Sequence, residues 1–421
     1  MQLPDDFIQQ IRPLFGDERF ERFLRALDEE SPVSIRVNPK KAPSHLPRQG
    51  EAVPWCRGAF YLPTRPNFTF DPLLHAGCYY VQEASSMFLD EVVRQLLPSL
   101  TVDEGLQTTD TLDMCAAPGG KSTLLRSVLP DESVLYSNEP NRKRASILLE
   151  NVLKWGYKNH VVTNCYPRDY RKSKMKFDLI LCDVPCSGEG MFRKDPDSIK
   201  EWSLQNVERC QQLQREIVSD AWECLNDGGL LIYSTCTYNT KEDEENVRWI
   251  KEELGAEILP IETKPEWGIT GSLLEGFNEP VYRFIPGYTH GEGLFMAVMR
   301  KKILPYPQAM RGGRSHTHLP KTMQILNILT PPLPQQGGIG GEASFPLSYS
   351  DAIAYLRGEA IQLPCDAPRG IIAVSFMRQH LGFVKNIGNR ANNLYPKEWR
   401  IKSTHIPTEY TPIIEYKQSQ S

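Results

Sequence analysis

From about residue 109 to residue 302, short apolar runs alternate with longer segments whose apolar residues recur at helical spacing. The runs are TLDMCAA, SVLYSNE, HVVTNC, FDLILCDV, GLLIYSTC and GLFMAVMRK; RKRASILLENVLKWG and NVERCQQLQREIVSDAWECL are among the helical segments. This alternation predicts βαβ units and a mostly parallel sheet that is covered by helices on both faces. Ligands of such sheets bind beyond the carboxyl ends of the strands, so the residues that follow each run are the candidates for chemistry.

Two regions of different character flank this alternating segment. Residues 1–105 contain two amphipathic helical stretches broken at Gly16, a short alternating strand and a proline-broken extended stretch, which predict a small α/β region. Residues 303–345 are rich in Pro, Gly and polar residues and predict a linker with one short helix near residues 323–329. Residues 346–421 predict a compact α+β unit with a hairpin. The α/β domain then covers residues 106–302.

The composition is that of an ordinary globular protein, with 40% hydrophobic and 24% charged residues among 421. No apolar run approaches the ~18 residues that a membrane-spanning helix needs, and the N-terminus has no apolar signal core. We therefore expect a cytoplasmic protein without membrane contact. The ten cysteines include no CxxC pair and no zinc-like spacing, so we predict neither a disulfide framework nor a metal site.

Charge is divided unevenly along the chain. Residues 301–421 hold 14 Lys and Arg against 7 Asp and Glu, whereas the first 300 residues hold 34 against 45. A basic appendage on an acidic body favours a module that contacts phosphate. Aromatic residues lie among these cations in MRQHLGFVKNIGNRANNLYPKEWR, which suits contact with RNA. The same composition also suits a small domain with solvated cations and buried aromatic rings.

The stretch LDMCAAPGGKS joins a predicted strand to a predicted helix through two adjacent glycines. Such glycines let the backbone approach a ligand, and the free N–H groups at a helix start favour anionic or polar ligand groups. The phosphate-loop pattern GxxxxGK[ST] needs glycine where Cys115 stands, and GxGxxG is also missing. Glu139 ends the next strand, where an acidic residue commonly binds ribose hydroxyls. Together they predict a nucleoside-bearing cofactor, of which S-adenosylmethionine is the common one.

Two cysteines follow two other predicted strands, Cys186 after FDLILCDV and Cys236 at the end of GLLIYSTC. Both should therefore face the crevice that holds the cofactor. A thiolate that attacks C6 of a pyrimidine turns C5 into a carbon nucleophile, which can take a methyl group from S-adenosylmethionine. Asp183, three residues before Cys186, is placed to stabilise charge at N3 of the base. The second thiol is a candidate for releasing the product.

At these motifs the sequence closely resembles the Sun-domain family of RNA cytosine-5 methyltransferases, in particular the bacterial subgroup that acts on 16S ribosomal RNA. The matching stretches are SIRVNP, VQEASSM, DMCAAPGGK, NEPNRKRASILLENVLKWG, DVPCSGEGMFRKDP, YSTCTYNTKEDEENV, GEGLFMAV and LGFVKN…NNLYPKEWR. The resemblance implies a Rossmann-like class I methyltransferase domain, a leading RNA-binding region and a C-terminal RNA-binding domain of the PUA-like kind. It implies 16S ribosomal RNA, or the small ribosomal subunit, as the partner.

The resemblance also implies roles for individual residues. Cys236 matches the covalent nucleophile, Cys186 the cysteine linked to product release, and Asp183 the acid that contacts the target base. Lys194 lies in a segment near the site and is given a supporting role. The matching S-adenosylmethionine contacts are Cys115, Ala116, Ala117, Pro118, Gly119, Gly120, Lys121, Glu139 and Asp183, with Asn164 in place of the acidic residue that many relatives carry near the adenine.

Three alternatives stay open at this point. A DNA cytosine-5 methyltransferase attacks with the cysteine of a Pro-Cys motif that is usually followed by glutamine, whereas Cys186 is followed by Ser-Gly and a second cysteine is present. A methyltransferase that acts on tRNA shares the core motifs. An RNA-binding ribosome assembly factor without catalysis would keep the fold, but both cysteines are intact here.

Overall fold

The computed structural model describes residues 1–42, 45–100, 108–303, 324–326, 344–403, 406–407 and 409–416. Its N-terminal region begins with α1 (Asp5–Phe15) and α2 (Asp17–Asp28). Gly16 separates the two helices with a positive φ of 75°, which confirms the predicted break. A four-stranded sheet follows in the order β3 (Glu51–Ala52), β4 (Ala59–Leu62), β1 (Val33–Val37), β5 (Tyr79–Val81), together with α3 (Pro72–His75) and α4 (Leu89–Leu100).

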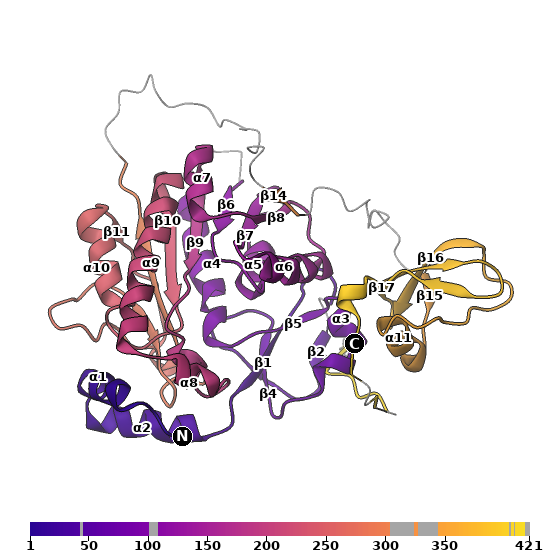
Figure 1. The fold of residues 1–421 in the computed structure, drawn as a ribbon, viewed down its shortest axis with the longest axis horizontal. Coiled ribbons are helices and arrows are strands. Elements are labelled where there is room, and N and C mark those ends of the chain that lie inside the picture. The colour runs from indigo at the N-terminus through magenta and orange to yellow at the C-terminus, as the bar shows by residue number, and fades with distance from the viewer. Residues whose placement is uncertain are drawn as a thin grey trace, which may run out of the picture.

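The centre of the molecule is a nine-stranded sheet (Figure 1). Its order is β11 (Glu257–Ile258), β13 (Leu294–Arg300), β10 (Leu225–Thr235), β9 (Phe177–Asp183), β6 (Thr111–Asp113), β7 (Leu135–Asn138), β8 (His160–Asn164), β14 (Gln324–Ile325), and β12 (Tyr282–Phe284) also pairs with β13. The five strands from β10 to β8 are parallel, as predicted. The chain builds outward from β6 to β8 and then returns to the other side of β6 with β9. This reversal creates a crevice at the carboxyl ends of β6 and β9, where ligands of such sheets bind.

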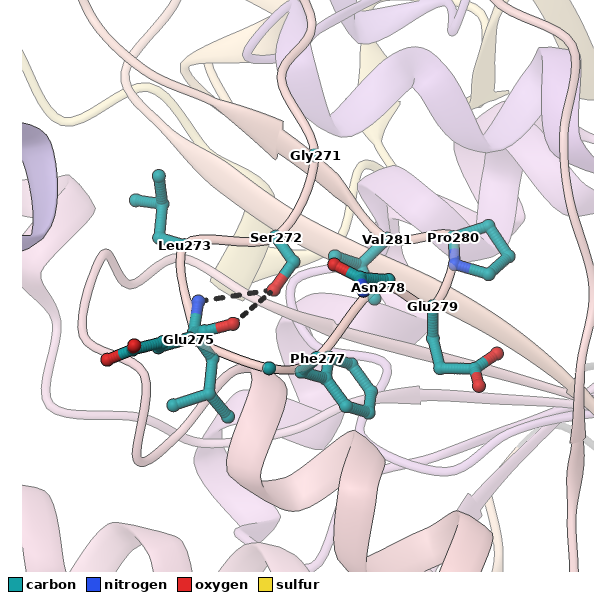
Figure 2. A pocket seen from close by; sticks show the side chains of 11 residues that line it. Gly271, Ser272, Leu273, Glu275, Phe277, Asn278, Glu279, Pro280 and Val281 are labelled. Atoms are coloured by element: carbon teal, nitrogen blue, oxygen red, sulfur yellow. Dashed lines mark hydrogen bonds between the residues drawn. The ribbon is translucent and has the colours of Figure 1, made fainter.

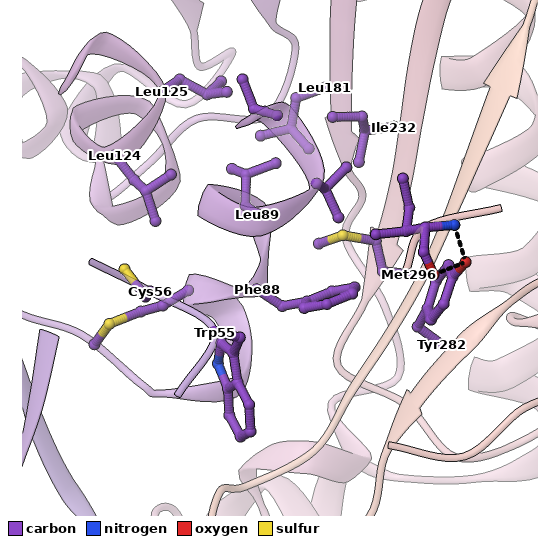
Figure 3. Close-up of a cluster of buried hydrophobic side chains, with 14 of the residues drawn as sticks. Trp55, Cys56, Phe88, Leu89, Leu124, Leu125, Leu181, Ile232, Tyr282 and Met296 are labelled. Carbon is purple, nitrogen blue, oxygen red and sulfur yellow. Dashed lines mark hydrogen bonds between the residues drawn. The ribbon is translucent and has the colours of Figure 1, made fainter. Parts of the chain in front are cut away.

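Helices cover both faces of this sheet. On one face, α4 and α5 (Gly120–Val128) bury Leu89, Leu124 and Leu125 against Leu181 and Ile232 of the strands (Figure 3). On the other face lie α7 (Pro167–Ser173), α9 (Leu204–Cys224) and α10 (Glu244–Glu253), while α6 (Arg142–Trp155) packs beside β8. The short helix α8 (Asp197–Glu201) precedes α9. Among the described residues, every helix is too short or too polar to cross a membrane.

The C-terminal region forms a second, smaller sheet of β15 (Ser344–Pro346), β16 (Gly370–Phe376), β17 (Gln379–Asn386) and β18 (Ala391–Asn393), with α11 (Tyr349–Leu356) (Figure 1). It packs on the N-terminal region, since Tyr355 and Val384 share an apolar core with Ile35 and Leu73. The last strand, β19 (Ile414–Tyr416), pairs with β2 (His45–Pro47) of the N-terminal region.

One sequence prediction is wrong in this part of the chain. Residues 324–325 form β14, antiparallel to β8, and not the helix that was expected near 323–329. The rest of that expected helix lies outside the described residues. An edge of a parallel sheet offers unpaired backbone groups, and these favour a strand over local helix propensity.

Replacement of Leu89 by alanine tests the packing of this core. The side chain is fully buried between α5 and the sheet, so Leu89→Ala should lower the free energy of unfolding by about 3 kcal/mol. The measurement is denaturant unfolding followed by circular dichroism. Ile147→Ala, at a side chain that is 49% exposed, is the control and should change stability by less than about 0.5 kcal/mol; equal losses would contradict this packing.

Candidate active site

A cavity of about 350 Å³ lies at the crevice between β6 and β9. Its walls come from five parts of the chain that are far apart in sequence. They are Tyr80–Glu83 and Ser86; Asp113, Cys115–Pro118, Gly120 and Lys121; Asp183, Gly190, Met191 and Lys194; Cys236; and Glu292–Leu294. Most residues predicted for the cofactor and for catalysis therefore meet in one cavity.

Another hollow, of about 460 Å³, is lined by the consecutive residues 271–281 (Figure 2). It is formed by a single loop, in which Ser272 contacts the backbone of Leu274. None of the predicted site residues lines it. The candidate active site is therefore the smaller cavity at the ends of the strands.

The turn after β6 is shaped by glycine. Gly119 has a φ of 115° at the start of α5, a conformation that side-chain-bearing residues rarely adopt. A Cβ atom at Gly119 would also lie 3.2 Å from Leu148 of α6. The turn can therefore bring the backbone of Ala116, Ala117 and Gly120 to the wall of the cavity.

Lys121 joins this turn to the end of β9. Its Nζ lies 2.9 Å from Oδ1 of Asp183, which also accepts a hydrogen bond of 2.7 Å from Ser234. Burial works to lower the pKa of Lys121, but the Asp183 carboxylate and the nearby Cys236 outweigh it and raise that pKa. Lys121 is therefore a fixed positive charge in the cavity wall that Cys236 also lines.

The two predicted thiols lie in contact, with 3.2 Å between Sγ of Cys186 and Sγ of Cys236. The hydrogen bond to Cys236, together with burial, raises the pKa of Cys186 well above its ordinary value. Either sulfur can donate in this contact, so the two thiols share one hydrogen bond. Cys236 lines the cofactor cavity, whereas Cys186 lines a separate hollow of about 620 Å³ on the far side of Met191. The pair thus places one thiol in the wall of the candidate cavity and the other behind it.

Asp113, the last residue of β6, was not singled out by the sequence. One carboxylate oxygen accepts from Ser122 Oγ at 2.6 Å, and the other, Oδ1, is buried without a partner in the described part of the chain. Burial raises the pKa of Asp113 to about 7. An unpartnered acidic oxygen in a cavity wall suits a ligand that carries a positive charge.

Three residues predicted for the cofactor, Gly119, Glu139 and Asn164, are not in the cavity wall. Glu139 is buried, accepts from the backbone N–H of Asn141 at 2.8 Å and pairs with Arg144 at 3.3 Å. Asn164 donates from its side chain to the backbone oxygens of Glu139 and Pro140. Both support the turn after β7, and their contacts with the cofactor stay predictions.

Residues of the N-terminal region form a wall that sequence reasoning did not assign to the site. Tyr80, Gln82 and Glu83 line the cavity, and Gln82 accepts from Arg36 at 3.1 Å. Arg36 in turn donates to the backbone oxygen of Gly120 at 3.3 Å. The only signal in the sequence was the stretch VQEASSM, which was matched to the leading region and not to the cavity.

This sheet order, with a glycine turn after its first parallel strand, defines a Rossmann-like class I methyltransferase that uses S-adenosylmethionine. Three family models match the chain: 16S rRNA methyltransferase RsmB/F over residues 102–300, the N-terminal domain of 16S rRNA methyltransferase RsmF over 3–84, and the methyltransferase RsmF PUA domain over 342–401. Together they match well over half of the chain, which belongs to the RsmB/F methyltransferase family.

Individual relatives agree with this assignment. The chain is 28% identical to ribosomal RNA small subunit methyltransferase F of Salmonella agona, over 94% of this chain and 96% of that protein. It is 33% identical to the protein of that name from Enterobacter sp., over 72% of this chain and 64% of the relative, so this closer likeness spans just under two thirds of the relative's length.

Solved structures share the fold. A methyltransferase homologue from Pyrococcus horikoshii matches with a TM-score of 0.54 and 25% identity, over 71% of this chain and all of that one. NSun6 from Pyrococcus horikoshii, solved with the S-adenosylmethionine analogue SFG, matches with a TM-score of 0.57 and 20% identity, over 72% and 99%.

The raised pKa of Asp113 predicts how stability depends on pH when no cofactor is bound. The folded state holds the proton to about pH 7 and the unfolded state loses it near pH 4, so this contribution is complete below pH 4 and is lost as the pH rises through 7. From pH 5 to pH 7 the wild type should lose about 2 kcal/mol relative to Asp113→Asn, measured by urea unfolding. The exposed Glu132→Gln is the control; a pH-independent difference between wild type and Asp113→Asn would contradict the prediction.

Proposed function

We propose that the protein transfers a methyl group from S-adenosylmethionine to C5 of a cytidine in RNA, through a covalent bond between Cys236 and C6. The observation that carries the proposal is the pair of thiols 3.2 Å apart, one of which lines the cofactor cavity beside Lys121. A single thiol is enough to attack the base. A second one in contact with it suits a reaction in which the first must also be released.

The residues at the cavity fit the cofactor. S-adenosylmethionine carries an ammonium group, and the buried Asp113 carboxylate has an oxygen that no described residue contacts by a hydrogen bond. The glycine turn leaves room for the rest of the molecule along Ala116 and Ala117. When bound, the cofactor supplies an electrophilic methyl group.

The proposed reaction divides the chemistry between the two thiols. The Cys236 thiolate adds to C6, and Asp183, held by Lys121 and Ser234, stabilises the charge that develops at N3. C5 becomes nucleophilic and takes the methyl group. Cys186 then assists β-elimination: the C5 proton passes to solvent, the electron pair of the C5–H bond forms the C5–C6 double bond, and the C6–S bond breaks with its electron pair returning to Cys236. One methyl group enters and one proton leaves, so the ring double bond is restored.

We propose 16S ribosomal RNA as the substrate, in the cytoplasm. The relatives named above are small-subunit methyltransferases, and a family model of the RsmF PUA domain matches the basic C-terminal region. The target cytidine has to reach Cys236 unpaired, because C6 is not accessible inside a helix. Lys194, at the cavity wall, is placed to support this substrate. We also propose that the chain forms three folded segments, which cover residues 1–105, 106–302 and 346–421.

Single substitutions at the two thiols test the division of roles. Cys236→Ala should abolish formation of 5-methylcytidine, because no nucleophile is left for C6. Cys186→Ala should form a covalent protein–RNA adduct that survives a denaturing gel, because attack proceeds while release fails. Normal turnover by Cys186→Ala, or an adduct formed by Cys236→Ala, would show that the roles are assigned wrongly.

Asp113→Asn should weaken binding of S-adenosylmethionine about tenfold, which corresponds to ~1.4 kcal/mol. The substitution keeps an acceptor for Ser122 but removes the negative charge beside the proposed ammonium position. Isothermal titration calorimetry measures the change, with Glu132→Gln as control. Unchanged affinity would exclude this contact.

A further inference from the structure

Each of the two loops that carry the thiols is bound by a buried carboxylate from the other loop. Glu189 follows Cys186 by three residues, and Glu242 follows Cys236 by six. Each carboxylate reaches across to the opposite loop. Building on the proposed function, we propose that Glu189 and Glu242 are positioning residues. They fix the positions of the two thiols relative to each other, so that attack and release can follow in turn.

Glu189 holds the loop of the nucleophile. Its Oε2 accepts from the backbone N–H groups of Tyr238 at 2.6 Å and Asn239 at 3.1 Å, which lie two and three residues after Cys236. Its Oε1 accepts from the indole N–H of Trp202 at 3.0 Å. The position of the backbone after Cys236 is therefore set by a side chain from the other loop.

Glu242 holds the loop of the release thiol. Its Oε2 accepts from the backbone N–H of Ser187 at 3.0 Å and from Gln214 at 2.7 Å, and its Oε1 accepts from the Ser187 hydroxyl. Gln214 also donates to the backbone oxygen of Pro185 at 2.9 Å. The residues on both sides of Cys186 are thus fixed from the Cys236 loop and from α9.

Two further contacts link the halves of this arrangement. The side-chain amide of Asn239 donates to Glu189 at 2.9 Å and to Glu242 at 3.0 Å, so one group bridges both carboxylates. The backbone N–H of Gly190 donates to the backbone oxygen of Cys236 at 2.8 Å. A Cβ atom at Gly190 would lie 2.9 Å from that oxygen, so only glycine allows the loops to approach this closely.

The burial of these carboxylates points to a positioning role. Both residues are fully buried, and in the part of the chain that the structure describes neither is ion-paired with Lys, Arg or His. Burial raises the pKa of both groups, which disfavours their charged forms. Acidic residues that are unfavourable to bury are kept here because each accepts several converging N–H and O–H groups, as a carboxylate can. Neither lines the cofactor cavity or the hollow at Cys186, so both act through the loops.

Because the two carboxylates hold different thiols, their loss should affect different steps. Glu242→Gln turns one acceptor oxygen into a donor that faces other donors, and it releases Ser187 next to Cys186. Glu189→Gln likewise replaces an acceptor oxygen by a donor, and it releases the backbone after Cys236. The first change should impair product release, and the second should impair attack on C6.

The experiment measures covalent protein–RNA adduct on a denaturing gel together with 5-methylcytidine formed from S-adenosylmethionine and 16S rRNA. Glu242→Gln should accumulate adduct, as Cys186→Ala does, while turnover falls at least tenfold. Glu189→Gln should lose turnover to a similar extent with less adduct than Glu242→Gln. The matched control Glu245→Gln, on the same segment but partly exposed, should resemble the wild type in both measurements.

A merely structural role would lower adduct and turnover in parallel in both variants, and that result would overturn the proposal. Should Glu242→Gln not fold, Ser187→Ala removes one donor of the same contact and should still raise the adduct fraction; a wild-type fraction would overturn the proposal. The proposed function fails separately, if the wild type forms no 5-methylcytidine and Cys186→Ala forms no adduct.

Discussion

The register between β9 and β10 is the constraint on which the site depends. The two strands are parallel, with Asp183 paired to Ser234, so they end level with each other at the same edge of the sheet. Cys186 follows Asp183 by three residues, Cys236 follows Ser234 by two, and their sulfurs meet at 3.2 Å. A slip of one residue would move one strand end by about 3.3 Å and separate the thiols.

The N-terminal helices stabilise this arrangement from outside the sheet. Phe7 of α1 packs edge-on against Phe192 and Trp202, and Phe23 of α2 packs against Tyr238. These partners lie in or next to the loops that follow Cys186 and Cys236, and Trp202 and the backbone of Tyr238 also donate to Glu189. The leading region therefore supports the thiols through aromatic packing, in addition to forming a wall of the cofactor cavity.

Local patterns predicted the sheet and its ligand-binding edge, because strand and helix periodicities are visible within a few residues. The same reasoning predicted that Cys186 and Cys236 both face the cofactor crevice. The structure brings the two sulfurs together near Asp183 and Lys121, but of the two thiols Cys236 lines that cavity and Cys186 lines the neighbouring hollow. That reasoning did not reach Asp113, because a sequence does not show that one of its carboxylate oxygens is buried without a partner among the described residues.

Contacts between segments that are distant in the sequence could not be predicted from local patterns either. Glu189 and Glu242 bind groups about fifty residues away in the sequence, and Gln82, which lines the cavity, accepts from the distant Arg36. β14 was mistaken for a helix because its two residues become a strand only beside β8. Periodicity carries no information about such partners, since they are set by the packing of the whole chain.

The most direct test of the account is methyl transfer from labelled S-adenosylmethionine to naked 16S rRNA, assembled small ribosomal subunits and bulk tRNA, followed by nucleoside analysis. The account predicts label in 5-methylcytidine of at least one ribosomal substrate, and the better of the two shows which assembly state the enzyme recognises. Label found only in tRNA would contradict the proposed substrate. Absence of label from all three, with cofactor binding demonstrated, would contradict the proposed activity.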